Sequence, residues 1–549
     1  MRDRRNTNLS TSSAGSTNSS TSAPPRASLN EKRYTSPPPD KGLLPLPVTK
    51  ENKSRPLSRR NLVLRCFAAL CAFLWLLHWG LSYSAWTRST QAVPETATTH
   101  DVKDLPEEPT ALLVTDKAGE QRWTVSIPAN APFPLKAGQY QDICTQSEAL
   151  SSSFAQRSRL ERVKDWRRKS VYYREDPAYL DVAEAQRTGV LPASPAAGNQ
   201  TCQSSMTFSM ATEDVSFGKT LLLLWMSYGL AKKEGRAFFI DDSHWPYGSY
   251  TTYFLPPPSQ GCTPPPRTQI VPCPHTAQHI VVSAATAPWT FGPAFKAEFA
   301  TPRYGLERGN GGSNNHHTYA LLRAGYEALF HLFGDDAKYV AQRTRDLAAS
   351  PAPQIALQIR RGDLHPFEYE YSRDYLPLER YASAAHRLLS RLQPHPSEPA
   401  TLLLASDDPT LPTHPDLLLA LLPSALAPAQ TRIQLATKAA LDASSPAEPI
   451  RAPGSAYVKH VDENAGWDGG FYPSLFAALA GPEESRVREL VGRGFLLDLA
   501  VAGSGEGVVC AVSGAACRVL GVMVGWEGVL GGRWANVDDG RGWSWDGRG

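Results

Sequence analysis

Two adjacent arginines, Arg360 and Arg361, follow an apolar run over residues 355–359. Each guanidinium carries a fixed charge and a fork of donors, so the pair could grip a diphosphate. Ser513-Gly514, directly before a helical pattern over 515–524, would add backbone N–H groups and the positive end of a helix dipole. An isolated Arg-Arg pair usually lies on a surface, so a phosphate site requires that these two segments meet in the fold.

Two carboxylates extend this chemistry. Asp498 follows the apolar run Gly494–Leu497 and could accept two hydrogen bonds from the N1–H and 2-amino edge of guanine. Glu368, seven residues after Arg361, is a candidate general base beside bound phosphates. Together with the arginines, these residues describe a site for a nucleoside-diphosphate sugar.

Three short motifs have ordinary alternative explanations. Arg361-Gly362-Asp363 matches an adhesion tripeptide by letter, but it adjoins an expected buried strand, and such short motifs recur by chance. Asp407-Asp408 before Pro409 could bind a metal, although a turn that ends a strand is the default. Gly218-Lys219-Thr220 resembles part of a P-loop, but Glu213 stands where the first glycine is required, so that motif fails.

The elements that must position these residues alternate along the second half of the chain. Helical spacing of apolar residues predicts helices over 378–392 and 515–524. Alternating strands and helices argue for an α/β fold with a doubly wound parallel sheet. Each strand ends in polar or charged residues, and open α/β sheets bind ligands at the carboxyl ends of their strands. The four predicted strands are Ile355–Ile359, Thr401–Ala405, Gly494–Leu497 and Gly507–Val512.

Before residue 350, strand and helix patterns alternate less regularly. An apolar run over 221–230 predicts a helix, and Ala237–Ile240 predicts a strand that ends in Asp241-Asp242. A Pro-rich loop spans 255–274, where Cys262 and Cys273 could tether it. Residues 87 to about 195 are polar and Pro-punctuated, with one helical patch around Phe154–Tyr172, and indicate a stem that becomes ordered toward its end.

The charge distribution is a membrane-topology signal. The 549 residues carry a net charge of +3, but residues 1–60 hold 12 Lys/Arg and 4 Asp/Glu, which gives +8 before residue 61 and −5 after it. Leu62–Tyr83 is apolar apart from Arg65 and is long enough to cross a bilayer. The basic residues before it place that end in the cytosol. A cleaved signal peptide should start near residue 1, so we expect a single-span type II membrane protein that binds no nucleic acid.

Cysteine usage agrees with an oxidising lumen. Six cysteines follow the predicted span, an even number that is compatible with disulfides, and none shows the short paired spacing of a zinc site. Asn199-Gln-Thr201 is a glycosylation sequon that would be reachable there.

At these residues the sequence resembles the α-1,6-fucosyltransferase family, which includes the core N-glycan enzyme and the bacterial nodulation fucosyltransferases. The segment 360–363 looks like the family's donor-binding Arg-Arg-x-Asp motif, and Glu368 falls where its catalytic glutamate falls. Ala405–Pro409 resembles the family's Asp-Asp-Pro segment, and Leu496–Leu499 resembles the strand whose aspartate reads guanine. The resemblance covers roughly residues 196–530 and is weak over 275–345.

The cysteines extend the resemblance. Cys510 and Cys517 have the spacing of a family disulfide that brackets a phosphate-contacting serine, here Ser513. Cys202 and Cys262 resemble another bridged pair, with Phe217-Gly218 and His244–Tyr247 in matching places between them. The partner of Cys144 is left open, with Cys273 as the remaining candidate.

The resemblance implies a GT-B-like two-lobed fold, GDP-fucose as donor, a glycan or glycoprotein acceptor, inversion at the sugar carbon, and no required metal or cofactor. Glu368 would deprotonate the acceptor hydroxyl while Arg360 and Arg361 stabilise the departing GDP. A Golgi membrane location follows, and a homodimer is allowed. The implied donor-binding residues are Asp363, Phe217, Gly218, Tyr247, Asp407, Asp408, Asp498, Ser513 and Gly514.

Three departures from the family pattern keep alternatives open. Leu364 replaces a lysine of the animal members, although His365 could substitute for it. Ser513-Gly514-Ala515 replaces a Ser-Ser-Gln stretch, and no SH3-like module follows. The alternatives are a catalytically weak membrane-anchored protein that binds a nucleotide sugar or a glycan, and a transferase that uses another nucleotide sugar.

These patterns divide the chain into six expected parts. They are a disordered basic cytoplasmic tail over 1–61, a transmembrane signal anchor over 62–83, a stem over 84–195, an N-terminal α/β lobe over 196–349, a Rossmann-like donor-binding lobe over 350–530, and a Gly/Trp-rich tail over 531–549.

Overall fold

The structure is a computed structural model, and it describes residues 105–157, 171–193, 200–211, 216–299, 315–361, 375–393, 399–436, 460–462, 467–469 and 482–547. All of them fall in one unit of the chain, Ala92–Gly549. The predicted membrane span over 62–83, Asn199, Asp363 and Glu368 lie outside the described residues. Among the residues described, no helix is both long and apolar enough to cross a membrane.

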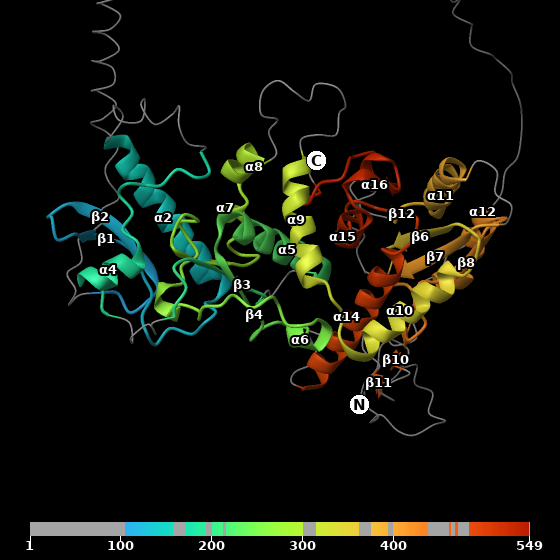
Figure 1. Ribbon diagram of the computed structural model, residues 1–549, viewed down its shortest axis with the longest axis horizontal. Helices are drawn as coiled ribbons and strands as arrows, with labels where there is room; N and C mark the ends of the chain where they lie inside the picture. Colours follow the sequence, from blue (N-terminus) through green and yellow to red (C-terminus); the bar gives the residue numbers. More distant parts are fainter. Residues whose placement is uncertain are drawn as a thin grey trace, which may run out of the picture. The chain divides into compact units, whose positions relative to one another are not determined.

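A five-stranded parallel sheet lies at the centre of the second half of the unit (Figure 1). Its first strand in the chain lies in the middle, the next two run to one edge, and the last two add on the other side. Strand order therefore reverses between β6 and β12, and such a switch point is where open parallel sheets bind ligands. In spatial order the strands are β13 (Trp534–Asn536), β12 (Gly507–Cys510), β6 (Gln354–Ile359), β7 (Thr401–Ser406) and β8 (Ala425–Pro428).

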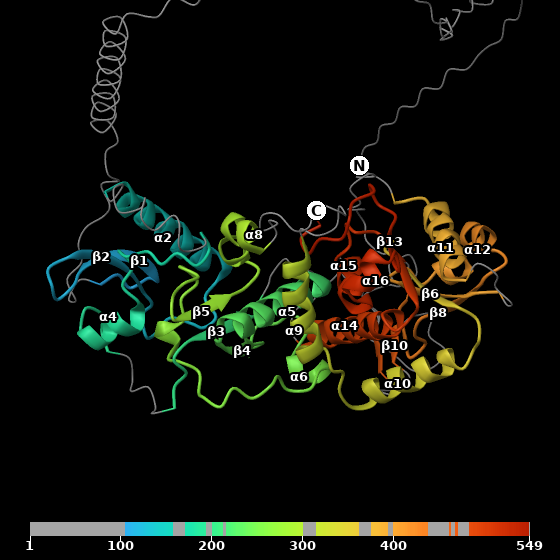
Figure 2. The same cartoon turned by 45° about the horizontal axis from the view of Figure 1, so that its top comes forward.

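Alternate residues of these strands face two different helix layers. Ile355 and Leu357 of β6 pack in one buried cluster with α11 (Leu378–Leu392) and α12 (Pro415–Leu421). Ala356, between them, belongs to the cluster on the opposite face, which includes residues of α14 (Pro482–Ala502) and α15 (Ala515–Val524). Figure 2 shows α11 and α15 on their separate sides of the strands. The sheet is doubly wound, and the predicted α/β class with a parallel sheet is confirmed.

One predicted strand is wrong. Gly494–Leu497 does not form a strand but lies inside the 21-residue helix α14. Leu497 packs with Ile433 on one side of this helix, whereas Leu496 faces the main core on another. A helix that is buried on two sides has a continuous run of apolar residues in its sequence. Hydrophobic periodicity alone cannot distinguish such a run from a buried strand.

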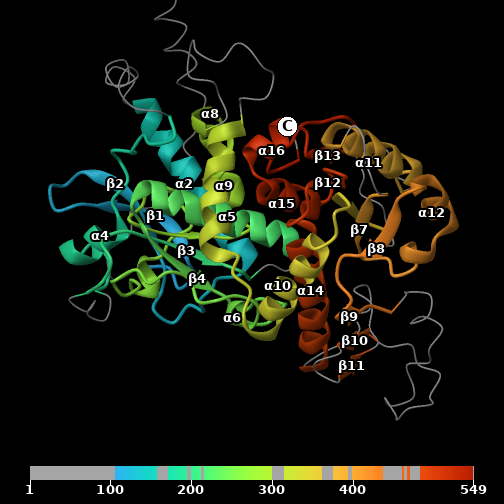
Figure 3. The same ribbon diagram turned by 45° about the vertical axis from the view of Figure 1, so that its right-hand side comes forward.

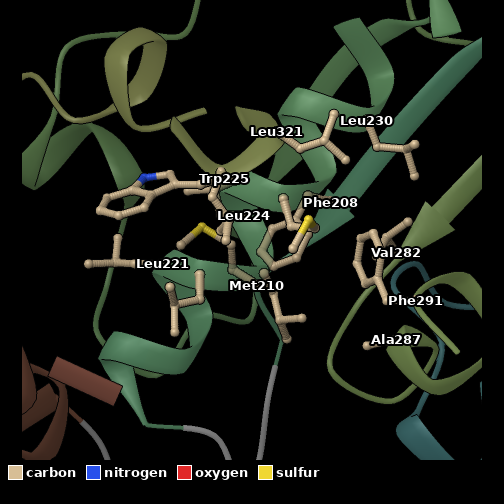
Figure 4. Packing of buried hydrophobic residues seen from close by; sticks show 14 of the residues in the cluster. Phe208, Met210, Leu221, Leu224, Trp225, Leu230, Val282, Ala287, Phe291 and Leu321 are labelled. Atoms are coloured by element: carbon tan, nitrogen blue, oxygen red, sulfur yellow. The ribbon is translucent and has the colours of Figure 1, made fainter. Parts of the chain in front are cut away.

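A second parallel sheet of three strands has the order β4-β3-β5. These strands are β3 (Ser205–Ser209), β4 (Ala237–Asp241) and β5 (His279–Val282). The helix α5 (Phe217–Glu234) is preceded by its N-cap Ser216, whose hydroxyl accepts a hydrogen bond from the Lys219 N–H. Its apolar side chains share a buried cluster with those of β3, and Figure 4 labels Trp225 of α5 and Phe208 of β3 among its members.

The region predicted as a stem contributes to the same core. An antiparallel hairpin of β1 (Thr110–Thr115) and β2 (Gln121–Ser126) is followed by α2 (Ala137–Arg157) and α4 (Val182–Thr188). Trp123 and Val125 are buried in the core that also holds α5. Of the helix predicted around Phe154–Tyr172, the first residues lie in α2, residues 158–170 lie outside the described residues, and Tyr172 lies in a turn, stacked on His275.

Three disulfides fix this arrangement: Cys144–Cys273, Cys202–Cys262 and Cys510–Cys517. The two pairs that the family resemblance implied are confirmed, and Cys273 is the partner of Cys144. The bond from Cys144 ties α2 to the chain just before β5, across 129 residues.

The C-terminal Gly/Trp-rich segment is an ordered part of the larger sheet. β13 pairs in parallel with β12, and the indoles of Trp534 and Trp543 are buried. Trp543 donates its indole N–H to the carbonyl of Arg518 in α15. The remaining elements are η3 (Arg267–Gln269), α6 (Tyr250–Tyr253), α7 (Ala287–Thr290), α8 (Pro293–Phe299), α9 (His316–Leu329), α10 (Gly334–Ala348), η5 (Leu411–Thr413), β9 (Ile433–Gln434), β10 (His460–Asp462), β11 (Trp467–Gly469) and α16 (Trp526–Leu530).

Candidate active site

A cavity of ≈ 220 Å³ opens at the switch point of the larger sheet and reaches the start of α5 beside the smaller one. Its walls come from the chain after β6 and β7, from α14, and from the first residues of α5 and α15. The lining residues are Ser216, Phe217, Gly218, Tyr247, Gln358, Arg360, Ala405, Ser406, Asp407, Leu435, Val491, Gly492, Phe495, Asp498, Leu499, Gly514, Ala515 and Ala516.

One part of the cavity is suited to an anion. Arg360, directly after β6, lines it together with the N-terminal residues of α5 and α15. The first N–H groups of a helix have no intrahelical partner and carry the positive end of the dipole, so two such ends beside a guanidinium favour phosphate. A Cβ on Gly218 would lie 3.1 Å from the Cβ of Ala515, so glycine lets the two helix ends approach closely.

The turn after β7 separates the two neighbouring aspartates. The Ser406 hydroxyl donates to the carbonyl of Ile359 at 2.7 Å, which joins β6 and β7 at their carboxyl ends. Asp407 lines the cavity and accepts the backbone N–H of Arg361 at 2.8 Å. Asp408 accepts from the N–H and hydroxyl of Thr410 instead and caps the following turn.

Asp498 projects from α14 into an apolar part of the cavity, where Val491, Phe495 and Leu499 are its neighbours in the wall. The residue as a whole is only partly buried. Burial nevertheless raises the pKa of this carboxyl well above its ordinary value, a hydrogen bond from the backbone N–H of Gln430 opposes the rise, and the nearby Asp407 adds to it. A carboxylate in such surroundings can accept further N–H donors from a ligand.

Aromatic rings form another wall. The Phe217 ring, at the first position of α5, lies 4.8 Å from the Tyr247 ring and 5.7 Å from the Phe495 ring, centroid to centroid. The Tyr247 hydroxyl accepts a hydrogen bond from the backbone N–H of Phe217, and burial raises the pKa of this phenol. A Cβ on Gly492 would lie 2.9 Å from the Phe217 ring, so glycine allows α14 to pack directly on this wall.

The loop that opens α15 is held by residues outside the cavity. Arg518 donates to the carbonyls of Ser513 and Trp545, at 3.3 and 3.1 Å. The side-chain oxygen of Asn536, at the end of β13, accepts the N–H of Val512 at 2.9 Å. The C-terminal strand therefore fixes the position of the helix N-terminus that faces the cavity.

Seven of the predicted site residues line this cavity: Arg360, Asp407, Asp498, Phe217, Gly218, Tyr247 and Gly514. Arg361, Asp408 and Ser513 are adjacent in sequence but are not among the lining residues. The Arg361 guanidinium lies over the Tyr375 ring, 5.2 Å from its centroid. Asp363 and Glu368 lie outside the described residues.

The sequence patterns missed part of the wall. Ser216 carries a recognisable signal, because a serine before an apolar helical run is a favoured N-cap. Phe495 was hidden by the wrong strand assignment in α14, and Val491 and Gly492 lie just before that predicted strand. Gln358 and Leu435 reach the cavity only through the pairing and folding of distant segments, and nothing local in the sequence indicates it.

Comparison with known proteins finds no matching family model and no matching curated protein. Among solved structures, the NodZ alpha-1,6-fucosyltransferase soaked with GDP-fucose matches at 12% identity, over 58% of this chain and 92% of that chain, with a TM-score of 0.30. The Se-Met fucosyltransferase NodZ from Bradyrhizobium matches at 12% identity, over 58% and 91% of the two chains, with a TM-score of 0.29. A variant of Arabidopsis thaliana FUT1 in complex with GDP matches at 10% identity, over 64% and 74%, with a TM-score of 0.32. The chain is thus similar to fucosyltransferase structures at low identity and low TM-score, and its function has to be inferred from its own residues.

Proposed function

We propose that this protein is an inverting glycosyltransferase of GT-B-like architecture that transfers fucose from GDP-fucose to a glycan or glycoprotein acceptor. One observation carries the proposal: a single cavity combines an anion-binding part, formed by Arg360 and two helix N-termini, with a partly buried carboxylate, Asp498. A guanosine diphosphate has the complementary groups, because its phosphates are anionic and its base offers two adjacent N–H donors.

The mechanism follows from where charge develops. As the fucosyl group leaves, negative charge builds on the β-phosphate, and a fixed guanidinium with aligned helix N–H groups stabilises that charge more than the ground state. We assign this role to Arg360 and the starts of α5 and α15, and we propose that the transfer proceeds without a metal ion. Glu368, assigned from the sequence, would accept the proton of the acceptor hydroxyl.

We further propose a Golgi location with the catalytic unit in the lumen. The basic residues before Leu62–Tyr83 support this orientation, since positive charge is retained on the cytosolic side of a span. The three disulfides support an oxidising compartment.

The test measures GDP release and product mass for the full chain in detergent, with GDP-fucose and a panel of glycan acceptors. Arg360→Ala removes the cavity-facing cation and should lower kcat/KM at least ~30-fold, about 2 kcal/mol of transition-state stabilisation. Arg361→Ala should lower it less, because its guanidinium stacks on Tyr375. Arg187→Ala, an exposed residue of α4 paired with Glu184, is the control and should match wild type.

Glu368→Gln supplies the second arm of this test and should abolish turnover while GDP still binds, because the proposed base acts on the acceptor. If Arg360→Ala and Glu368→Gln both turn over like wild type, the site assignment is wrong.

A second candidate function is a catalytically weak, membrane-anchored protein that binds a nucleotide sugar, which Leu364 in place of lysine favours. It predicts GDP-fucose binding by calorimetry without turnover on any acceptor, so one detected product excludes it. A third hypothesis is a transferase that uses another nucleotide sugar as donor. Activity with a panel of GDP- and UDP-sugars tests it, and the Asp498 carboxylate favours GDP.

A further inference from the structure

Outside the cavity, one aspartate binds two arginines from different segments. Asp336 lies in the first turn of α10, and its side chain is 12% exposed. Arg493 of α14 donates to both of its carboxylate oxygens, at 2.9 and 3.0 Å, in a two-pronged geometry. The guanidinium of Arg432 lies 3.4 Å from the same carboxylate. None of these three residues lines the cavity.

Asp336 is an anion that both arginines of this cluster share. Arg432 is 4% exposed and Arg493 is 17% exposed, so two positive charges are held largely away from water around one carboxylate. Removing one partner of a buried ion pair is strongly destabilising, because it leaves an uncompensated charge. Loss of the Asp336 carboxylate would take from both guanidiniums the anion they share.

Each arginine belongs to a segment that builds the Asp498 part of the cavity. Arg493 stands in α14 between Gly492 and Phe495, which both line it. Figure 3 shows α10 alongside α14, where Asp336 and Arg493 meet. The carboxylate therefore fixes how α14 is turned toward the cavity.

The second segment reaches Asp498 through the backbone. Arg432 lies two residues after Gln430, whose backbone N–H donates to Asp498. The Gln430 side chain donates to the carbonyl of Ile433 and accepts its N–H, at 2.8 and 2.9 Å, which closes this turn on itself. Arg432 also donates to the carbonyl of Asp335 at 2.7 Å, so the turn is anchored on the start of α10.

We propose that Asp336 is a positioning residue for the base-binding part of the cavity, and that it sets the selectivity for guanine. This inference rests on the proposed nucleotide binding at the cavity. The anion-binding part is built from other elements, the end of β6 and the starts of α5 and α15. Loss of Asp336 should therefore weaken recognition of the base and leave recognition of phosphate intact.

The experiment compares Asp336→Asn with Asp335→Asn in the full chain. Asp335 is the matched control, since it precedes Asp336 in the same helix turn but its side chain is 65% exposed and pairs with Lys338. Calorimetry with GDP, UDP and inorganic pyrophosphate separates base from phosphate binding. Hydrogen exchange over residues 487–499 reports on α14 without any ligand.

We expect Asp336→Asn to weaken GDP binding roughly 10- to 100-fold, the size of effect that small misplacements of site groups produce, with an equal loss of the GDP-to-UDP preference. Pyrophosphate affinity should stay within about 3-fold of wild type, since Arg360 and the starts of α5 and α15 belong to elements other than α10 and α14. Exchange protection of α14 should fall. Asp335→Asn should behave as wild type in every measurement.

The inference is overturned if Asp336→Asn keeps the wild-type GDP-to-UDP preference and α14 protection, if GDP and pyrophosphate weaken equally, or if Asp335→Asn has the same effects. Should Asp336→Asn fail to fold, Arg493→Lys keeps the charge but removes the two-pronged contact, and a folded Arg493→Lys chain with wild-type selectivity overturns the inference. If wild type binds none of the probes, the proposed function fails, and the exchange measurement alone decides the role of Asp336.

Discussion

At the residue scale, the carboxyl of Asp498 lowers the stability of the folded protein, although we propose that it binds the guanine base. Burial raises its pKa above the ordinary value of 3.8, so the folded protein holds this proton more tightly than the unfolded chain does. Its contribution to the unfolding free energy is thus fully present below that value and is lost as pH rises through the raised folded-state pKa. Ionising Asp498 in the folded protein therefore costs stability, and a guanine base would offset this cost by donating hydrogen bonds to the carboxylate.

Asp498→Asn should consequently be more stable than wild type at neutral pH, and the difference should vanish in acid. The same variant should bind GDP about 10- to 100-fold more weakly, because an amide replaces a charged acceptor of two N–H groups. Denaturant unfolding across pH and GDP calorimetry check both effects. Asp408→Asn, which alters the turn cap outside the cavity, should keep wild-type GDP affinity. A destabilised Asp498→Asn at neutral pH would contradict the assignment.

At the element scale, the anion site depends on two helix N-termini that approach because one residue has no side chain. A Cβ at position 218 would lie 3.1 Å from the Ala515 Cβ and 3.4 Å from the backbone of α15. Gly218→Val should force α5 and α15 apart, cost about 1–3 kcal/mol of stability and weaken pyrophosphate as well as GDP. This pattern differs from that of Asp336→Asn, which spares pyrophosphate.

Two further variants test this prediction by calorimetry and thermal unfolding. Ala515→Gly added to Gly218→Val should restore part of the affinity, because it removes the nearest contacting atom. Gly138→Ala, at a helical glycine with open space around its missing Cβ, should leave nucleotide binding unchanged. Equal binding by Gly218→Val and wild type would mean that the spacing of the two helices does not shape the site.

At the scale of the whole unit, the disulfides divide into one that holds the fold and one that holds the site. Cys144–Cys273 closes a separation of 129 residues, and Cys510–Cys517 closes one of 7. Chain-entropy estimates give about 5 kcal/mol for the first closure and about 2.5 kcal/mol for the second. The double variant Cys144→Ser/Cys273→Ser should therefore lose roughly 5–7 °C in Tm and keep its GDP affinity once folded.

Compared with the Cys144→Ser/Cys273→Ser variant, Cys510→Ser/Cys517→Ser should lose less Tm and more GDP affinity. Its bond spans Gly514, whose position in the cavity wall depends on the loop before α15. Thermal scans without reductant and GDP calorimetry compare the two variants. Equal losses of GDP affinity in both would show that the short disulfide has no special role in the site.

Much of the larger sheet could be predicted from local patterns. β6, β7, β12, α11 and α15 lie within a residue or two of their predicted positions, because each is a short segment whose burial pattern repeats at its own period. The residues just after these strands were identified for the same reason, as the first polar groups beyond an apolar run. α14 was mistaken for a strand because burial on two sides removes the helical period.

The sequence by itself determined the strands β6, β7 and β12 with their neighbouring helices α11 and α15, the charged groups that follow those strands, and the distribution of basic residues around one apolar span. Only the tertiary structure decided which groups meet. It separated Arg360 from Arg361 and Asp407 from Asp408, brought Asp498 to the cavity on a helix, and placed the C-terminal strand behind the phosphate-binding loop. The physical reason is the distance along the chain over which each interaction acts. Backbone preference and hydrophobic periodicity act over a few neighbouring residues. Parallel strand pairing and buried ion pairs join residues more than a hundred positions apart, as Asp336 and Arg493 are.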